Sequence, residues 1–489
     1  MSNYKSNLQS NNSALSANNI DLQSLIDRAN ALPDASGDNG QEIAAIFDKT
    51  ISGTYTNNRI TNIASYAFTN CSNLTSVSFP TCTNIDNHAF VSCSNLASVS
   101  FPVLKNIGAS AFHKCPKLTS IFFPACISIG YGAFQSCSSL TSVSFPVCKS
   151  IGDGVFAYCN NLTSVSFPVC TDIGNDVFIK CYSLTTAHFP VCTYIDNSTF
   201  YNCTSLTSVS FPKCTGIGSS VFAYCSSLTS VSFPACTSIG TYAFSSCTKL
   251  TSVSLPVCKS IGSSAFQYCT SLTTASFPEC ISIYNNAFCN CYSLTSVSLP
   301  VCTSIGAYTF GYCSNLTSAY FLVCTDIGNN AFRGCRTLSS LTLGASTVCT
   351  LANSNALSST PYAKYSTYFS GTPYIYVPSS LVASYKAATN WTYFSSYISA
   401  IGEANSGDSS SSNLITFTID EMSYQAEEGM TWAEWVESEY NTNGYNTNGK
   451  FIGYYNDFMD VFNGCICYQD YKGVECSETI IDGLHYIFD

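Results

Sequence analysis

The stretch Asn70-Cys-Ser-Asn-Leu-Thr-Ser-Val-Ser-Phe-Pro80 sets the pattern for most of this 489-residue chain. Its leucine, Leu74, recurs every 22 residues as far as Leu338, and a phenylalanine keeps the same period from Phe68 to Phe332 without an insertion. Self-similarity at a fixed period of this length is the mark of a repeat architecture, in which each coil packs against its neighbours.

Within each unit the apolar residues follow the spacing L-x-x-L-x-L-x-x-N/C, which is typical of a leucine-rich repeat solenoid. We therefore predict a solenoid of 22-residue coils, with a short parallel strand at each Thr-Ser-Val-Ser-Phe segment. The inward positions of one coil are predicted to be Leu74, Val77, Phe79, Cys82, Ile85, Ala89, Phe90 and Cys93. A glycine often follows the isoleucine, as at Gly108, Gly130, Gly152 and Gly174, and is predicted to permit the next turn.

The cysteines form a second regular pattern. Of 29 cysteines, 13 follow the repeating phenylalanine by three residues and 11 occupy the ninth consensus position, where Leu104 once replaces cysteine. A leucine in that position indicates a buried apolar slot that needs no partner thiol. Columns of free thiols are expected, with occasional oxidation between neighbouring coils as the alternative. The structural ladder is assigned to Phe68, Phe90, Phe112, Phe134, Cys71, Cys93, Cys115, Cys82 and Cys126.

Composition excludes several classes of partner. The chain is 46% hydrophobic and only 10% charged, against about 25% charged in an average protein. Its net charge is −11, and residues 413–489 carry most of it, with 14 Asp and Glu against Lys450 and Lys472. No basic stripe suits nucleic acid, no apolar run suits a membrane span, and the first residues lack the apolar core of an export signal.

The chain is predicted to have five parts. Residues 1–49 form a Ser/Asn-rich leader, which is either a short coiled-coil handle for homo-oligomers or a frayed end with one amphipathic helix and a cap. Residues 50–350 form the solenoid, and residues 351–403 its C-terminal cap, with a strand from Tyr374 and a helix over 379–389. A Ser-rich linker (404–412) leads to an acidic α/β domain (413–489) that begins with a hairpin.

The sequence offers little for catalysis. It holds four histidines, three of them in separate coils, and we find none of the common nucleotide, hydrolase or metalloprotease motifs. One group, Cys465, Cys467, Cys476 and His485, has zinc-type ligands, but its spacing fits no common zinc site and buried thiols are the plainer interpretation. The protein is therefore expected to be no enzyme, with no catalytic, cofactor-binding or metal-binding residues.

Candidate contact residues are sought where outward positions depart from the repeat. One strand position that is nearly always Ser becomes Phe122, His188 and Tyr320, and an exposed aromatic there suits a protein or sugar partner. The alternative is neutral drift at exposed positions. A second set occupies the position before the ladder cysteine and is expected to line one side of the solenoid: Tyr158, Tyr224, Tyr268 and Tyr312.

The repeat L-T-S-V-S-F-P-x-C-x-x-I-G-x-x-A-F-x-x-C, with the end segment I-Y-V-P-S-S-L-V-A-S-Y-K-A-A-T-N-W, resembles the BspA-type leucine-rich repeat family over residues 51–400. That resemblance implies a surface adhesin or antigen that binds host proteins or other cells. Two further segments, 21–33 and 415–436, are similar to segments of structural, tail-fibre-like proteins of phages and prophages.

Together these observations predict a non-enzymatic recognition protein on a phage or prophage tail, which binds a host-surface protein or glycan. It would be found in the virion, or outside the cell after lysis. The alternatives are a BspA-like adhesin on the bacterial cell surface and a purely structural spacer.

Overall fold

The computed structural model describes residues 49–363 and 373–402 with their side chains, and the backbone alone at 414–419, 422–427 and 485–486. The chain divides into two compact units, Met1–Ser399 and Ala400–Asp489, and each is described by itself. The predicted leader helix and coiled-coil handle, the Ser-rich linker and the side chains of the zinc-type group lie outside the described residues.

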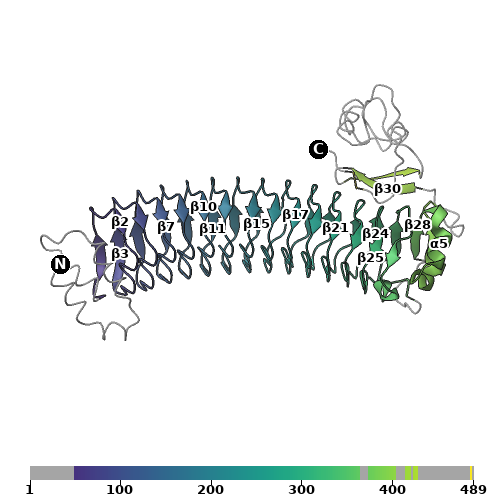
Figure 1. The fold of residues 1–489 in the computed structure, drawn as a ribbon, viewed down its shortest axis with the longest axis horizontal. Helices are drawn as coiled ribbons and strands as arrows, with labels where there is room; N and C mark the ends of the chain where they lie inside the picture. Colours follow the sequence, from purple (N-terminus) through teal and green to yellow (C-terminus); the bar gives the residue numbers. More distant parts are fainter. Residues whose placement is uncertain (1–48, 364–372, 403–413, 420–421, 428–484, 487–489) are drawn as a thin grey trace, which may run out of the picture. The chain divides into compact units, whose positions relative to one another are not determined.

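The first unit is a parallel β-solenoid, as predicted (Figure 1). Most coils contribute two strands, one at the Thr-Ser-Val-Ser-Phe segment and one of two residues that ends at the repeating isoleucine. In most coils both pair in parallel with the equivalent strand of the next coil at a 22-residue offset, as in Ser76 with Ser98 and Ile85 with Ile107. The coils therefore follow one another in sequence order from β2 to β27 (Figure 1).

The strands of the first series, which begin the solenoid and cover its Ser-rich face, are β1 (Gly53–Thr56), β3 (Leu74–Ser78), β5 (Ser98–Ser100), β7 (Ser120–Phe122), β9 (Ser142–Ser144), β11 (Ser164–Ser166), β13 (Thr186–His188), β15 (Ser208–Ser210), β18 (Ser252–Ser254), β20 (Thr274–Ser276), β22 (Ser296–Ser298), β24 (Ser318–Phe321) and β26 (Ser340–Leu343). One coil has only an isolated bridge, Ser232 with Ser254.

The two-residue strands are β2 (Asn62–Ile63), β4 (Asn84–Ile85), β6 (Asn106–Ile107), β8 (Ser128–Ile129), β10 (Ser150–Ile151), β12 (Asp172–Ile173), β14 (Tyr194–Ile195), β16 (Gly216–Ile217), β17 (Ser238–Ile239), β19 (Ser260–Ile261), β21 (Ser282–Ile283), β23 (Ser304–Ile305), β25 (Asp326–Ile327) and β27 (Thr350–Leu351).

A series of overlapping turns closes each coil between its two-residue strand and its Ser-rich strand. Alternate N–H groups there donate to the next coil: Phe68 N to Ala89 O at 2.7 Å and Asn70 N to Val91 O at 2.8 Å. This alternation places two residues per coil, four apart, in the left-handed region, as at Tyr66 (φ +63°) and Asn70 (φ +60°). The turns thus join neighbouring coils by backbone hydrogen bonds as the strands do.

The glycine after the isoleucine is needed for a different reason from the one predicted. Gly108 does not have the left-handed φ of a turn glycine; instead, a Cβ built on it would lie 2.6 Å from the backbone nitrogen of Asn87 in the preceding coil. No real Cβ tolerates such a contact, so the missing side chain lets two coils approach closely. The left-handed positions come two and six residues later, at Ser110 and Lys114.

The core consists of columns of identical side chains. All eight inward positions predicted for the coil at Leu74 are at most 2% exposed. Phe68, Phe90, Phe112 and Phe134 stack nearly parallel, with successive ring centroids 4.9, 5.0 and 5.2 Å apart. A second phenylalanine column, which includes Phe79, packs against the first edge-on or tilted. Each ring therefore depends on a neighbouring coil for its burial.

A short cap follows the last coil. β28 (Tyr374–Val377) adds to β26 in the predicted place, and β29 (Ile398–Ala400) adds to β28. The predicted helix over 379–389 is shorter, comprising a 3₁₀ turn η2 (Ser379–Leu381) and α5 (Val382–Ala387), and η3 (Trp391–Tyr397) follows. A further 3₁₀ turn, η1 (Ser354–Leu357), precedes them. Trp391 Nε1 donates to Cys349 O at 2.7 Å, which fastens the cap to the array.

The described backbone of the second unit is a three-stranded sheet. β30 (Leu414–Ile419) and β31 (Met422–Glu427) pair antiparallel, as the predicted hairpin requires, and β32 (His485–Tyr486) pairs in parallel with β30. The rest of the predicted acidic α/β domain lies outside the described residues.

Stacking of the core leads to a prediction that compares two phenylalanines ten residues apart, Phe112 and Phe122. Phe112→Ala is expected to lower the free energy of unfolding by about 3–5 kcal/mol, because it leaves a cavity in a fully buried column. Phe122→Ala, at a side chain that is 63% exposed, is the matched control and is expected to change it by less than about 0.5 kcal/mol. Urea unfolding followed by circular dichroism measures both, and equal effects would contradict the stacking.

Candidate interaction surfaces

The first predicted contact set falls into one column of the Ser-rich face. Phe122 pairs with Ser144, His188 with Ser166 and Ser210, and Tyr320 with Ser298, so all three replace the same serine. Phe122 and His188 are exposed, whereas Tyr320 is half-buried, and burial raises the pKa of its hydroxyl to about 12.

These three residues do not form one site. Phe122 and His188 are three coils apart and His188 and Tyr320 six, which at the ordinary strand spacing is about 14 Å and about 29 Å. They are separate candidate contact points along one face. Close to Tyr320, the strand register places Tyr376 beside Thr342, and Tyr376 stacks on Tyr374 with centroids 5.7 Å apart.

The second predicted set, Tyr158, Tyr224, Tyr268 and Tyr312, occupies one column of the turns. Each has a φ of +61° to +63° and is 39–49% exposed. A bulky residue rarely adopts that conformation, and the fold imposes it here by the backbone hydrogen bond that each residue donates to the next coil.

Two of these tyrosines have a cation from the next coil beside their rings. Lys180 Nζ lies 5.2 Å from the ring centroid of Tyr158, and the Arg333 guanidinium lies 6.0 Å from that of Tyr312. Such contacts stabilise the ring position by about 0.5–1 kcal/mol at an exposed site. They also occupy part of the ring face. Tyr224, whose ring contacts that of Tyr201 edge-on with centroids 5.5 Å apart, and Tyr268 are the more exposed members of the column.

Sequence reasoning missed a third exposed set. Tyr131, Tyr194 and Tyr284 are 59%, 48% and 55% exposed, and all lie on or just after the two-residue strands. The Tyr194 ring lies over Gly216 of the next coil, where an added Cβ would come within 2.9 Å of its Cε2 atom. These tyrosines share no single repeat position, so periodicity alone does not group them.

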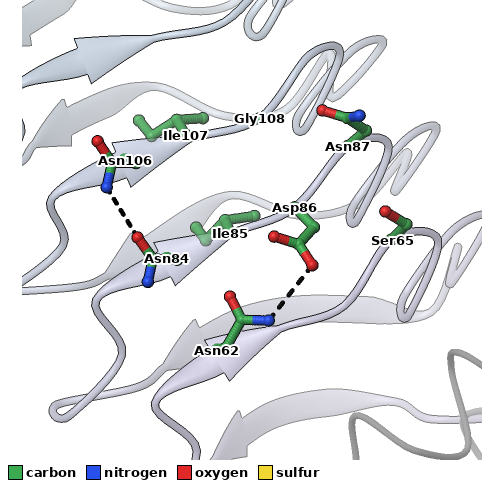
Figure 2. A pocket seen from close by; sticks show the side chains of 9 residues that line it. All are labelled: Asn62, Ser65, Asn84, Ile85, Asp86, Asn87, Asn106, Ile107 and Gly108. Carbon is green, nitrogen blue, oxygen red and sulfur yellow. Dashed lines mark hydrogen bonds between the residues drawn. The ribbon is translucent and has the colours of Figure 1, made fainter.

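A polar groove also escaped the sequence analysis. It has a volume of about 330 Å³ and lies across β2, β4 and β6, the first three two-residue strands (Figure 2). Ile85 and Ile107 are its buried apolar members. Its polar side chains come from three strand asparagines and from the turns beside them: Asn62, Asn84, Asn106, Ser65, Asp86 and Asn87. The signal was visible, because the asparagines recur every 22 residues before serine replaces them at Ser128.

Carboxylates gather on this same side of the coils. Of the acidic residues at 49–363, all except Glu279 lie on the two-residue strands or the turns after them. Burial, followed by the charges of Asp172 and Asp153, raises the pKa of Asp196, and burial with Asp153 does the same for Asp176. In the described residues the one side-chain ion pair joins Lys259 and Glu279, so these carboxylates are not neutralised by salt bridges.

The described residues contain no arrangement of three or more His, Cys, Asp or Glu side chains suited to a metal ion. The Nδ1 atoms of His88 and His113 are buried without hydrogen-bond partners, and burial lowers the pKa of His113. Tyr66 stacks on His88 at 4.8 Å. Among the described helices, none is long and apolar enough to cross a membrane.

Most of the thiols lie within the core as two columns. All 26 described cysteines are free and buried. Thiols of the first column donate to a carbonyl of the preceding coil, as in Cys93 to Phe68 O at 3.0 Å and Cys115 to Phe90 O at 3.2 Å. Those of the second donate within their own coil, as in Cys82 to Asn84 O and Cys126 to Ser128 O.

Comparison with known proteins identifies the family that has this architecture. The sequence matches the family described as "BspA type Leucine rich repeat region (6 copies)" over residues 61–185, 127–251, 171–292 and 237–364. The protein is thus a leucine-rich repeat solenoid, a class of typically non-enzymatic binding scaffolds. Because the matched residues make up more than half of the chain, it belongs to the BspA-type leucine-rich repeat family.

The chain is similar to several solved structures, including the following two. A leucine-rich repeat protein from Bacteroides ovatus is 25% identical, over 61% of this chain and 94% of that chain, with a TM-score of 0.49. A leucine rich cell surface protein from Faecalibacterium prausnitzii is 24% identical, over 55% of this chain and 88% of that chain, with a TM-score of 0.36. No curated protein matches the chain.

The thiol columns predict strong destabilisation at alkaline pH. Burial raises the pKa of Cys126 and Cys137 to about 12, from an ordinary value of 9.0. The unfolded chain therefore loses thiol protons above pH 9 that the folded chain retains. Each such thiol contributes its full share to the free energy of unfolding below pH 9. Between pH 9 and pH 12 the free energy of unfolding falls by about 1.4 kcal/mol per pH unit for each such thiol.

The midpoint of thermal unfolding, followed by circular dichroism from pH 7 to pH 10.5, measures this effect. A Cys137→Ala, Cys159→Ala, Cys181→Ala variant is the control, because it should show a smaller fall above pH 9 while losing some stability at pH 7. A midpoint that stays constant to pH 10.5 would contradict the assignment of buried, protonated thiols.

Proposed function

We propose that this protein is a non-enzymatic recognition protein, carried on a phage or prophage tail, whose solenoid binds a protein or glycan on a host surface. The observation that carries the proposal is Phe122, a phenylalanine with 63% of its surface exposed in a strand column of serines. An exposed aromatic supplies large contact area at low entropic cost, and such residues dominate the energy of protein interfaces.

Repetition supports the same proposal. The contact points at Phe122, His188 and Tyr320 are too far apart to act as one pocket, but a long partner or an array of identical partners could engage several at once. Weak contacts that are linked in this way combine into a strong one. A structural spacer has no comparable need for exposed aromatic side chains, so these residues favour recognition over a spacer.

Two observations bear on where the protein acts. The resemblance to tail-fibre-like proteins that we infer from the sequence of segments 21–33 and 415–436 supports a virion protein, as do the free thiols, which suit assembly in a reducing cytoplasm. Membership of the BspA-type family supports the alternative, an adhesin on the bacterial cell surface. Antibodies against the solenoid would label virion tails in the first case and intact uninfected cells in the second.

Recognition is tested with three serine substitutions that restore the repeat. Phe122→Ser, His188→Ser and Tyr320→Ser together are expected to weaken binding of the full chain to intact bacteria from a host panel by at least tenfold. Ser166→Ala, in the same column, is the matched control and should bind as the unmodified protein does. Unchanged binding by the triple variant would contradict the assigned face, and failure of the unmodified protein to bind any cell of the panel would contradict the proposed function.

A further inference from the structure

The groove over β2, β4 and β6 has polar side chains that hydrogen bonds between coils orient and only partly satisfy (Figure 2). Along the strands, Asn106 Nδ2 donates to Asn84 Oδ1 at 2.8 Å, and Ser128 Oγ donates to Asn106 Oδ1 at 2.9 Å. Asn62 Nδ2 donates to Asp86 Oδ2 at 3.3 Å. These bonds orient the amides and leave Asn62 Oδ1 and Asp86 Oδ1 without a hydrogen-bond partner in the described part of the chain.

The turn beside the strands adds a donor to these acceptors. Asn87 Oδ1 accepts from Ala109 N at 2.7 Å, which fixes the amide and directs its Nδ2 group away from that bond. Neither Asn87 Nδ2 nor Ser65 Oγ has a partner among the described residues. The groove therefore offers oriented acceptors and donors together, the combination that a ligand carrying several hydroxyl groups requires, since each hydroxyl both donates and accepts.

Aromatic surface lies next to these polar groups in the chain. Tyr66 follows Ser65 and His88 follows Asn87, and their two rings stack at 4.8 Å with an interplanar angle of 7°. Tyr66 is 38% exposed. Both rings lie outside the lining of the groove, so they are neighbours of its polar residues in sequence and are assigned no contact with the ligand.

Charge and composition exclude other ligands for this groove. Its lining contains one carboxylate, Asp86, and no lysine or arginine, so it does not suit phosphate, sulfate or an acidic sugar. A single carboxylate also falls short of the ligand set that Ca²⁺ takes in proteins. This combination is confined to the first three coils, because the asparagine does not recur after Asn106 and glycine stands in place of Asp86 at Gly108, Gly130, Gly152 and Gly174.

We propose that this groove binds a neutral saccharide unit, with Asp86 and Asn62 accepting from its hydroxyl groups and Asn87 donating to them. The inference deepens the proposed function and rests on it, because it assigns a neutral glycan to one part of the solenoid.

The test uses the full chain and immobilised oligosaccharides of four kinds: neutral hexose oligomers, neutral N-acetylhexosamine oligomers, sialylated and sulfated. Saturable binding to a neutral oligosaccharide is expected, and Asp86→Ala and Asn62→Ala should each weaken it at least tenfold. Asp196→Ala is the matched control, since it removes the same charge at the equivalent position five coils away and should leave binding unchanged. Thermal unfolding of each variant checks that the solenoid remains folded.

Three results would overturn the proposal: binding to none of the neutral oligosaccharides, binding only to acidic ones, or equal losses in Asp86→Ala and Asp196→Ala. Binding to cells separates this inference from the broader function. Cell binding that depends on Phe122 and is unaffected by Asp86→Ala, with no neutral glycan bound, overturns the groove and leaves the recognition function standing.

Discussion

The contact between one coil and the next is the constraint on which this structure depends. No coil can bury its own eight inward side chains, and each completes its core only against the coils before and after it. Stacked phenylalanines, thiols bonded to a carbonyl of the preceding coil and three sets of backbone hydrogen bonds act across the same boundary. All of them repeat with the same 22-residue period, so an error of one residue would break every set at once.

The same register between coils also determines how side chains are arranged on the surface. Because equivalent residues of successive coils lie side by side, an outward position becomes a column, and a substitution in one coil becomes a point on that column. Serine, threonine, asparagine and glycine fill most outward positions of a solenoid that has few charged residues. An exposed Phe122, or an asparagine that recurs only at 62, 84 and 106, therefore stands out chemically from its surroundings. Such a scaffold varies its contacts without altering its core.

The sequence was sufficient to predict the core and insufficient to predict the surface. The 22-residue period alone identifies the buried columns, because Phe68 and Phe90 occupy equivalent positions in their coils however the backbone between them runs. It does not reveal that Tyr66 and Asn70 are left-handed, because serine, lysine, histidine and tyrosine all occur there in other coils. From the repeat we predicted that Gly108 is needed for a turn. The structure shows instead that a Cβ there would clash with the backbone of the preceding coil, a contact that the sequence of a single repeat does not reveal.

Residues that depend on contacts between coils were the hardest to place. The groove needs side chains from three strands and the turns between them, so it emerges only when the coils are stacked. Tyr376 joins the column of Tyr320 across an insertion that breaks the period after Leu343. Tyr320 itself was expected to be exposed and is half-buried, because strand periodicity predicts the face of a side chain and not what packs beside it.

Excision of one coil tests whether the register between coils holds the fold together. Deleting residues 216–237, a full period of 22, keeps every column in register, and we expect a folded protein whose thermal unfolding stays cooperative. Deleting only 216–226 shifts all later coils by half a period and should abolish that transition. Equal tolerance of the two deletions, or equal loss in both, would contradict a fold held by coil-to-coil register.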